Sequence, residues 1–117
     1  MALLDIALLD IAGKLADQPI YKMLGGKDNR IRSYASTPMY EDVGAYMDKV
    51  EEFLDQGFRA VKFHTWCIAE DDLALAREAR KRFPDVTFML DAENNYVVED
   101  ALVVAKTLHE LDFEWFE

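Results

Sequence analysis

The sequence predicts an α/β fold in which parallel strands alternate with crossover helices. Beyond residue 30, short apolar segments alternate with amphipathic segments of helical length. The apolar segments are nearly continuous, which is typical of strands that helices cover on both faces. Three of these segments also end abruptly in charged side chains, as strands do where they leave a sheet. Such alternation predicts right-handed βαβ units in a parallel sheet.

The first 30 residues predict a helix, a short helical turn and a loop. Residues 2–16 are good helix formers and are apolar around most of the helix, so we expect neighbouring structure to cover several of its sides. Pro19 interrupts this helix. Residues 20–24 form a turn of helix, which ends at Gly25 and Gly26. A polar loop follows over residues 27–30.

Three crossover helices are expected in the rest of the chain. Residues 41–56 carry one broad apolar face and stop before Gly57. Residues 70–82 have acidic side chains in the first turn and basic ones in the last, which complements the helix dipole. Residues 97–111 form the third helix.

Four strands are expected between and around these helices. The first covers residues 31–36 and ends at a Thr-Pro turn. The second covers 59–64 (R-A-V-K-F-H), the third 86–91 (V-T-F-M-L-D) and the fourth 113–117 (F-E-W-F-E). The last three each end in a histidine or a carboxylate, so the sequence predicts that chemistry gathers at one edge of the sheet.

Composition excludes several classes of partner. The 117 residues are 51% hydrophobic, which suits a single domain with a modest core. With 13 basic against 23 acidic residues the net charge is −10, which argues against nucleic acid or an anionic membrane as partner. Cys67 is the one cysteine, so no intrachain disulfide forms, and we expect a cytoplasmic protein. Asp5 and Asp10 interrupt the apolar N-terminal stretch, which lacks a basic region and does not read as a signal peptide.

The strand ends supply a candidate site. Lys62 and His64 are two residues apart on one strand and therefore point to the same face. Asp91 and Glu117 end the next two strands. Two carboxylates at neighbouring strand ends suit Mg²⁺, which takes a few carboxylates and keeps several waters. A lysine and a histidine beside such a metal ion are suited to moving protons.

Each of these residues also has an ordinary structural interpretation. Asp91 alone would more often cap the following helix, and Lys62 alone would reach solvent or pair with an acid. His64 alone is more often a hydrogen-bonded structural residue, and Glu117 is open to solvation at the end of the chain. Asn94 is also typical of turns. Only the joint arrangement favours a catalytic site.

The chain also resembles a known family. Residues 7–26 (A-L-L-D-I-A-G-K-L-A-D-Q-P-I-Y-K-M-L-G-G) resemble the linker helix of the enolase superfamily, in the mandelate racemase and muconate lactonizing enzyme group. In that group this segment joins a capping domain to the barrel. The same order continues with Y-A-S in the first strand, G-F-R-A-V-K at the second, L-D-A at the third and a terminal W-F-E.

The resemblance implies a modified TIM (β/α) barrel, of which this chain supplies the first half, about four βα units. It implies that Mg²⁺ stabilises an enolate formed by removing the proton alpha to a carboxylate. The group's reactions are racemisation, cycloisomerisation and acid-sugar dehydration. The expected partner is therefore a small carboxylate, such as an acid sugar, and the enzyme class is lyase or isomerase.

Roles carry over to the residues that match the family's motifs. Asp91 matches the first metal ligand and Glu117 the second. Lys62 matches the first lysine of a K-x-K motif, while His64 stands where many members carry the basic lysine, so the identity of the base stays open. Glu93 stands where an asparagine is common, which makes Glu93 and the neighbouring Asn94 candidates for substrate contact.

The resemblance also implies what lies outside these 117 residues. Residues 1–30 would be the linker helix and loop, and 31–117 would carry barrel strands 1–4. The capping domain, the rest of the barrel and a third metal ligand would be absent, so the isolated chain is expected to be inactive. The alternative is a non-catalytic half-barrel that self-associates as a homo-oligomer through exposed sheet edges. A flat, doubly wound binding domain is disfavoured because no glycine-rich loop follows a strand.

Overall fold

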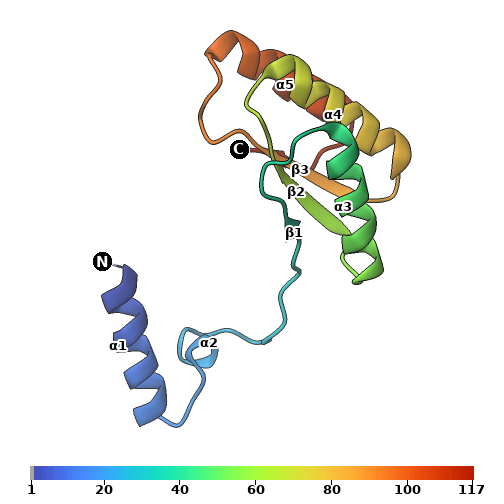
Figure 1. Ribbon diagram of the computed structural model, residues 1–117. Coiled ribbons are helices and arrows are strands. Elements are labelled where there is room, and N and C mark those ends of the chain that lie inside the picture. The colour runs from blue at the N-terminus through green and yellow to red at the C-terminus, as the bar shows by residue number, and fades with distance from the viewer. Residues whose placement is uncertain (1) are drawn as a thin grey trace. The chain divides into compact units, whose positions relative to one another are not determined.

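The structure is a computed structural model and describes residues 2–117 (Figure 1). It divides the chain into two compact units, one that ends at Arg32 and one that runs from Ser33 to Glu117. The first unit holds two helices, α1 (Ala2–Leu15) and α2 (Ile20–Met23). The second holds the strands β1 (Ala35–Ser36), β2 (Ala60–His64), β3 (Thr87–Asp91) and β4 (Trp115–Phe116) and the helices α3 (Val43–Asp55), α4 (Ala69–Arg82) and α5 (Val98–Glu110).

The chain turns from α1 into α2 at Asp17, which has a left-handed backbone, and this turn packs against Gly13. The backbone N–H of Gln18 donates to the carbonyl oxygen of Gly13 at 3.0 Å, and a Cβ at Gly13 would lie only 2.9 Å from the carbonyl oxygen of Gln18. A larger residue at Gly13 would therefore push the two segments apart.

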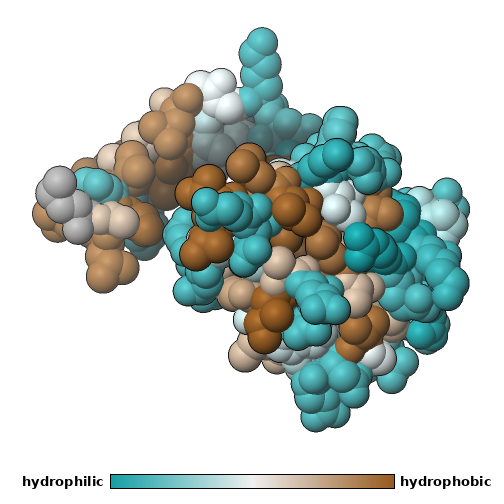
Figure 2. All heavy atoms as spheres, turned by 90° about the horizontal axis from the view of Figure 1, so that it is seen from above, coloured by the Kyte–Doolittle hydropathy of each residue, from teal (hydrophilic) through white to brown (hydrophobic). Residues whose placement is uncertain are grey.

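The sequence predicted that neighbouring structure would cover the apolar side chains of α1. In the structure these side chains are exposed to solvent (Figure 2). The large exposed ones on this helix are Leu3, Leu4, Ile6, Leu8, Ile11 and Leu15. Across residues 2–117, no helix is both long enough and apolar enough to cross a membrane.

The second unit contains one parallel sheet with the strand order β1-β2-β3-β4, so the predicted α/β class with crossover helices is confirmed. Strands β2 and β3 form its centre, and their register sets Lys62 opposite Met89 and His64 opposite Asp91. Residues in register on parallel strands point to the same side of the sheet. The side chains of Lys62, His64 and Asp91 therefore share one face.

The three helices of the second unit cover the other face of the sheet (Figure 1). The core lies between the helices and this face. Alternate strand residues point into the core and are fully or almost fully buried; they are Val61, Phe63, Phe88 and Leu90. The helices supply the matching side chains, chiefly Tyr46, Met47 and Val50 from α3, Leu75 and Ala79 from α4, and Val104 and Leu108 from α5.

The face without helices is concave. Tyr34 directly precedes edge strand β1, and Trp115 lies in the opposite edge strand β4. Their rings nevertheless meet edge to face, with centroids 5.5 Å apart. Neighbouring strands are about 4.8 Å apart, so a flat four-stranded sheet would separate its edges by roughly 14 Å. The contact is therefore typical of a sheet that curves as a barrel wall does.

The outer strands are shorter than the sequence predicted. The first was expected over residues 31–36, and β1 covers only its last two residues. Register explains this difference, because Ala35 pairs with Val61 and residues 31–33 would face the turn at Gly57. The fourth strand was expected over 113–117 and is Trp115–Phe116. Edge strands pair on one side only, which leaves their ends less constrained.

Candidate active site

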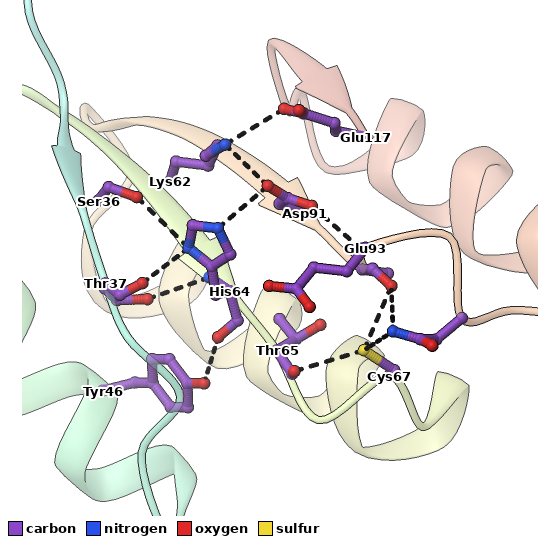
Figure 3. Close-up of polar contacts among 12 residues, drawn as sticks. Ser36, Thr37, Tyr46, Lys62, His64, Thr65, Cys67, Asp91, Glu93 and Glu117 are labelled. Carbon is purple, nitrogen blue, oxygen red and sulfur yellow. Dashed lines mark hydrogen bonds and ion pairs between the residues drawn. The ribbon is translucent and has the colours of Figure 1, made fainter.

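Lys62 lies between the side chains of Asp91 and Glu117 on the concave face (Figure 3). Its Nζ donates a 2.8 Å hydrogen bond to Oδ2 of Asp91 and a 3.2 Å hydrogen bond to Oε2 of Glu117. Lys62 and Asp91 are buried, with 8% and 7% of their surfaces exposed, whereas the Glu117 side chain is 59% exposed. One ammonium group therefore bridges carboxylates from two neighbouring strand ends.

Backbone hydrogen bonds fix Glu117 beside β3. Its N–H donates to the carbonyl oxygen of Leu90, and its own carbonyl oxygen accepts from the N–H of Ala92, both at 2.9 Å. The ladder between β3 and β4 therefore continues to the last residue. The carboxylates of Asp91 and Glu117 are held at adjacent points of one edge, as the sequence predicted for strand ends.

His64 connects this cluster to the end of β1. Its Nε2 lies 3.1 Å from Oδ2 of Asp91, and its Nδ1 lies 2.8 Å from the carbonyl oxygen of Thr37. The backbone N–H of His64 also donates to the Thr37 hydroxyl at 3.1 Å. A carbonyl oxygen only accepts, so Nδ1 carries a hydrogen and Nε2 is the nitrogen that faces the carboxylates. Thr37 was not among the predicted site residues.

The cluster favours ionised side chains. The hydrogen bond to Asp91 raises the pKa of Lys62 above its ordinary value; burial opposes this shift and the bond to Glu117 adds to it. Burial works to raise the pKa of Asp91, but the hydrogen bonds from Lys62 and from the N–H of Glu93 outweigh it and leave the pKa below its ordinary value. An ammonium and a carboxylate that stabilise each other in this way are both charged at neutral pH.

The two candidate substrate contacts follow Asp91 in a tight loop. Glu93 and Asn94 both have left-handed backbones, with φ of 50° and 62°. The N–H of Glu93 donates to Oδ1 of Asp91 at 3.0 Å, so the loop folds back on the strand end. Both side chains are exposed, and Asn95 rather than Asn94 turns toward the β2–α4 loop, where its Nδ2 donates to Sγ of Cys67.

A pocket of about 690 Å³ lies beside the cluster, at the carboxyl ends of β1, β2 and β3. His64 and Glu93, two of the predicted residues, line this pocket. The other lining residues are Thr37, Pro38, Met39, Thr65, Trp66, Cys67 and Asn95. His64 therefore borders both the carboxylate cluster and a space large enough for a small molecule.

A buried carboxylate braces the loops around this pocket. Asp72, in the first turn of α4, is fully buried and accepts hydrogen bonds from the hydroxyls of Thr65 and Tyr96 and from the N–H of Trp66. These partners come from the loops that follow β2 and β3. The sequence suggested only a helix-dipole role for this acidic turn. The spacing to the buried Leu75, three residues on, could have marked Asp72 as facing inward.

The donor set suits a divalent cation in part. Asp91 and Glu117 offer the hard carboxylate oxygens that Mg²⁺ prefers, and both already contact one positively charged group. Within residues 2–117, no cluster of three or more histidine, cysteine, aspartate or glutamate side chains is arranged to hold a metal ion. The residues present therefore fit two ligands of a Mg²⁺ site and leave its other positions to water or further groups.

Comparison with known proteins decides the family. The family model described as "Enolase C-terminal domain-like" matches residues 45–117. The chain belongs to the enolase superfamily. The resemblance to its mandelate racemase and muconate lactonizing enzyme group is also confirmed, because a solved structure from Pseudovibrio sp. that bears both names matches 96% of the chain, with 38% identity and a TM-score of 0.91.

Relatives in the enolase superfamily catalyse several reactions. Arabinonate dehydratase of Saccharolobus solfataricus is 33% identical over 118 residues, which cover 97% of this chain and 32% of the relative. The structure of 3,6-anhydro-D-galactonate cycloisomerase from Zobellia galactanivorans matches 97% of this chain and 32% of its own, with 32% identity and a TM-score of 0.85. The chain thus spans about a third of the length of the superfamily members it matches.

Proposed function

We propose that this chain supplies the first half of an active site that removes the proton alpha to the carboxylate of a small acid. The reaction would lead to racemisation, cycloisomerisation or acid-sugar dehydration. One observation carries the proposal: Lys62, His64 and Glu117 all lie within 3.2 Å of another member of the cluster, and two of them contact the same oxygen of Asp91. Charged and proton-carrying groups from three strand ends thus meet at one point.

In this proposal Asp91 and Glu117 would hold a Mg²⁺ ion together with water and ligands from elsewhere. Mg²⁺ would supply positive charge that stabilises the enolate charge that develops as the proton leaves carbon. Asp91 suits this role because its lowered pKa keeps it ionised and able to bind a cation.

Lys62 and His64 would divide the work on the substrate. The raised pKa of Lys62 keeps its ammonium charged, so Lys62 would attract the substrate carboxylate and would not act as the base. Nδ1 of His64 donates to the Thr37 carbonyl oxygen, so a neutral His64 would accept the substrate proton at Nε2 after this nitrogen has left Asp91. His64 also lines the pocket in which the substrate would lie.

The pocket supports a small polar substrate. Glu93 would accept hydrogen bonds from substrate hydroxyl groups at the pocket wall, and Asn94 would contact parts of the substrate that extend beyond it. The names of the relatives, arabinonate dehydratase and 3,6-anhydro-D-galactonate cycloisomerase, support an acid sugar as the substrate class.

The same proposal assigns residues 1–30 as a linker into the barrel and 31–117 as its first four strands, in a cytoplasmic enzyme. Because the chain spans about a third of its relatives, we expect the 117 residues alone to bind metal without turnover.

A calorimetric titration with Mg²⁺ tests the metal site in the 117-residue chain. We expect saturable binding that disappears in Asp91→Asn and persists in Asp85→Asn, a matched loss of one exposed carboxylate outside the cluster. Equal binding by both variants would contradict the proposed site. Circular dichroism of each variant would establish that the fold is retained.

A second candidate function is self-association without catalysis. Strands β1 and β4 each pair on one side only in the described sheet, and α1 exposes most of its apolar side chains. Unpaired edges and apolar surface of this kind favour contact with another copy. Light scattering over a range of concentrations would then give more than a monomer's mass, and a constant 13.5 kDa would exclude a homo-oligomer.

A further inference from the structure

We propose that Lys62 is a built-in competitor for the metal ion: its ammonium occupies the carboxylates of Asp91 and Glu117, and a divalent cation must displace it to bind. The inference deepens the proposed function and rests on it, because it requires these two carboxylates to be the metal ligands. It adds a role for Lys62 that is separate from any contact with substrate.

Lys62 contacts both carboxylates that are proposed as metal ligands. Its Nζ donates to Oδ2 of Asp91 at 2.8 Å and to Oε2 of Glu117 at 3.2 Å. Oδ2 of Asp91 also faces Nε2 of His64 at 3.1 Å, and Oδ1 accepts from the N–H of Glu93 at 3.0 Å. Both oxygens of Asp91 are therefore engaged already. A cation that bridges Oδ2 of Asp91 and Oε2 of Glu117 would enter the position that the Lys62 ammonium now holds.

Burial makes this competition strong. The side chains of Lys62 and Asp91 are 10% and 9% exposed, so water cannot easily replace either partner. Attraction between opposite charges, and repulsion between like charges, are stronger in such a site than in bulk water. A divalent cation between Asp91 and Glu117 would lie beside the ammonium and be repelled by it. The ammonium must therefore move when the metal binds.

An aromatic ring lies close to the ammonium in its present position. Nζ of Lys62 lies 5.9 Å from the centroid of the Tyr34 ring, within the range of a cation–π contact. The Tyr34 ring is itself positioned by its edge-to-face contact with Trp115. Withdrawal toward this ring would separate the ammonium from the carboxylates without a change in the backbone.

Metal affinity is the first test. Mg²⁺ binding would be measured by calorimetry in the unchanged chain, in Lys62→Met, and in Lys106→Met, which removes one exposed lysine of α5 as a matched change in net charge. We expect Lys62→Met to bind about tenfold more tightly or better, since a tenfold change corresponds to about 1.4 kcal/mol of removed competition. Lys106→Met should bind as the unchanged chain does.

The outcomes separate this inference from the proposed function. Suppose that Mg²⁺ binding depends on Asp91 but is no tighter in Lys62→Met than in the unchanged chain. This result would contradict the competition by Lys62 and would still support the metal site. Binding in none of the chains would overturn both. Binding detected only in Lys62→Met, and lost again in Lys62→Met/Asp91→Asn, would support both.

A measurement on the unchanged chain covers the case in which Lys62→Met does not fold. The ¹⁵N resonance of Lys62 Nζ would be followed during the Mg²⁺ titration, with that of Lys106 as the internal control. Displacement predicts a shift of the Lys62 signal in step with metal occupancy and none for Lys106. An unmoved Lys62 signal at saturation would overturn the inference.

Discussion

Arg80 Nε donates a 2.7 Å hydrogen bond to the carbonyl oxygen of Leu111, which lies 31 residues later in the chain. The same guanidinium donates to the carbonyl oxygens of Pro84, Val86 and Asp112 at 2.8 to 2.9 Å. One side chain of α4 thus donates hydrogen bonds to backbone carbonyl groups in the two turns that lead into β3 and β4. These turns lie at the end of the sheet opposite the carboxylate cluster.

Replacing Arg80 should therefore destabilise the fold. We expect Arg80→Lys to lower the free energy of unfolding by about 2 kcal/mol, because a single ammonium cannot reach four carbonyl oxygens and leaves some without a partner. Arg77→Lys, at an exposed position of the same helix, should change it by less than about 0.5 kcal/mol. Urea unfolding measures both. Equal midpoints for the two variants would show that Arg80 does not hold the turns.

The ring contact between Tyr34 and Trp115 should contribute to the curvature of the sheet. A double-mutant cycle with Tyr34→Leu and Trp115→Leu should give a coupling energy of about 0.5–1.5 kcal/mol in urea unfolding, as for other aromatic pairs. Phe53, whose ring contacts Phe58 in the same unit, offers a control, since Phe53→Leu should show no coupling to Trp115→Leu. Additive effects of Tyr34 and Trp115 would mean that the edges do not hold each other.

Asp72 and Asp91 should give the stability opposite dependences on pH. Burial raises the pKa of Asp72 above its ordinary 3.8 even though hydrogen bonds from Tyr96 and Thr65 oppose it, so its ionisation costs stability as pH rises above 3.8. The pKa of Asp91 lies below 3.8, so its stabilising contribution is present above that pH and is lost as pH falls through the folded-state pKa.

Unfolding midpoints over a pH series would measure this difference. Relative to the unchanged chain, Asp72→Asn should gain stability as pH rises above 3.8, and Asp91→Asn should gain as pH falls below it. Curves that stay parallel to that of the unchanged chain would contradict both assignments.

Thr37 should determine which nitrogen of His64 carries hydrogen. Its carbonyl oxygen accepts from Nδ1, and its hydroxyl accepts from the His64 backbone N–H. We expect ¹⁵N spectra of the 117-residue chain to show a hydrogen on Nδ1. Thr37→Val removes the hydroxyl and should weaken this preference, and Thr37→Ser should restore it. A bare Nδ1 in the unchanged chain would contradict the proposed orientation.

The central strands were predictable because the face that the helices cover gives each of them a regular set of apolar residues. Residues 59–64 and 86–91 were expected, and β2 and β3 cover Ala60–His64 and Thr87–Asp91. The positions of the strand ends follow from that pattern. The proximity of Lys62 and Asp91 could therefore also be predicted from the sequence. The extent of the edge strands depends on register with a partner, which a local pattern does not contain.

Two features of the site could not be obtained from local patterns. The spacing of Asp72 to Leu75 indicates that Asp72 faces inward, but only the fold shows that its partner is Tyr96, 24 residues away. The role of Thr37 depends likewise on a strand 27 residues later. The roles assigned to Lys62 and His64 in catalysis stay predictions.

The loops that border the pocket also bear on how this protein could be engineered. Cys67 and Glu93 line the pocket from different loops, and both have left-handed backbones, with φ of 61° and 50°. That conformation costs an ordinary residue about 1–2 kcal/mol and glycine very little, which offsets the extra freedom glycine gives the unfolded chain. Cys67→Gly and Glu93→Gly would therefore enlarge the pocket at little cost in backbone strain, although Cys67→Gly also removes the contacts of Sγ with Ala92 and Asn95. Directed evolution toward bulkier substrates would thus start at Cys67, and would leave Glu93 in place because the proposed substrate contact requires its carboxylate.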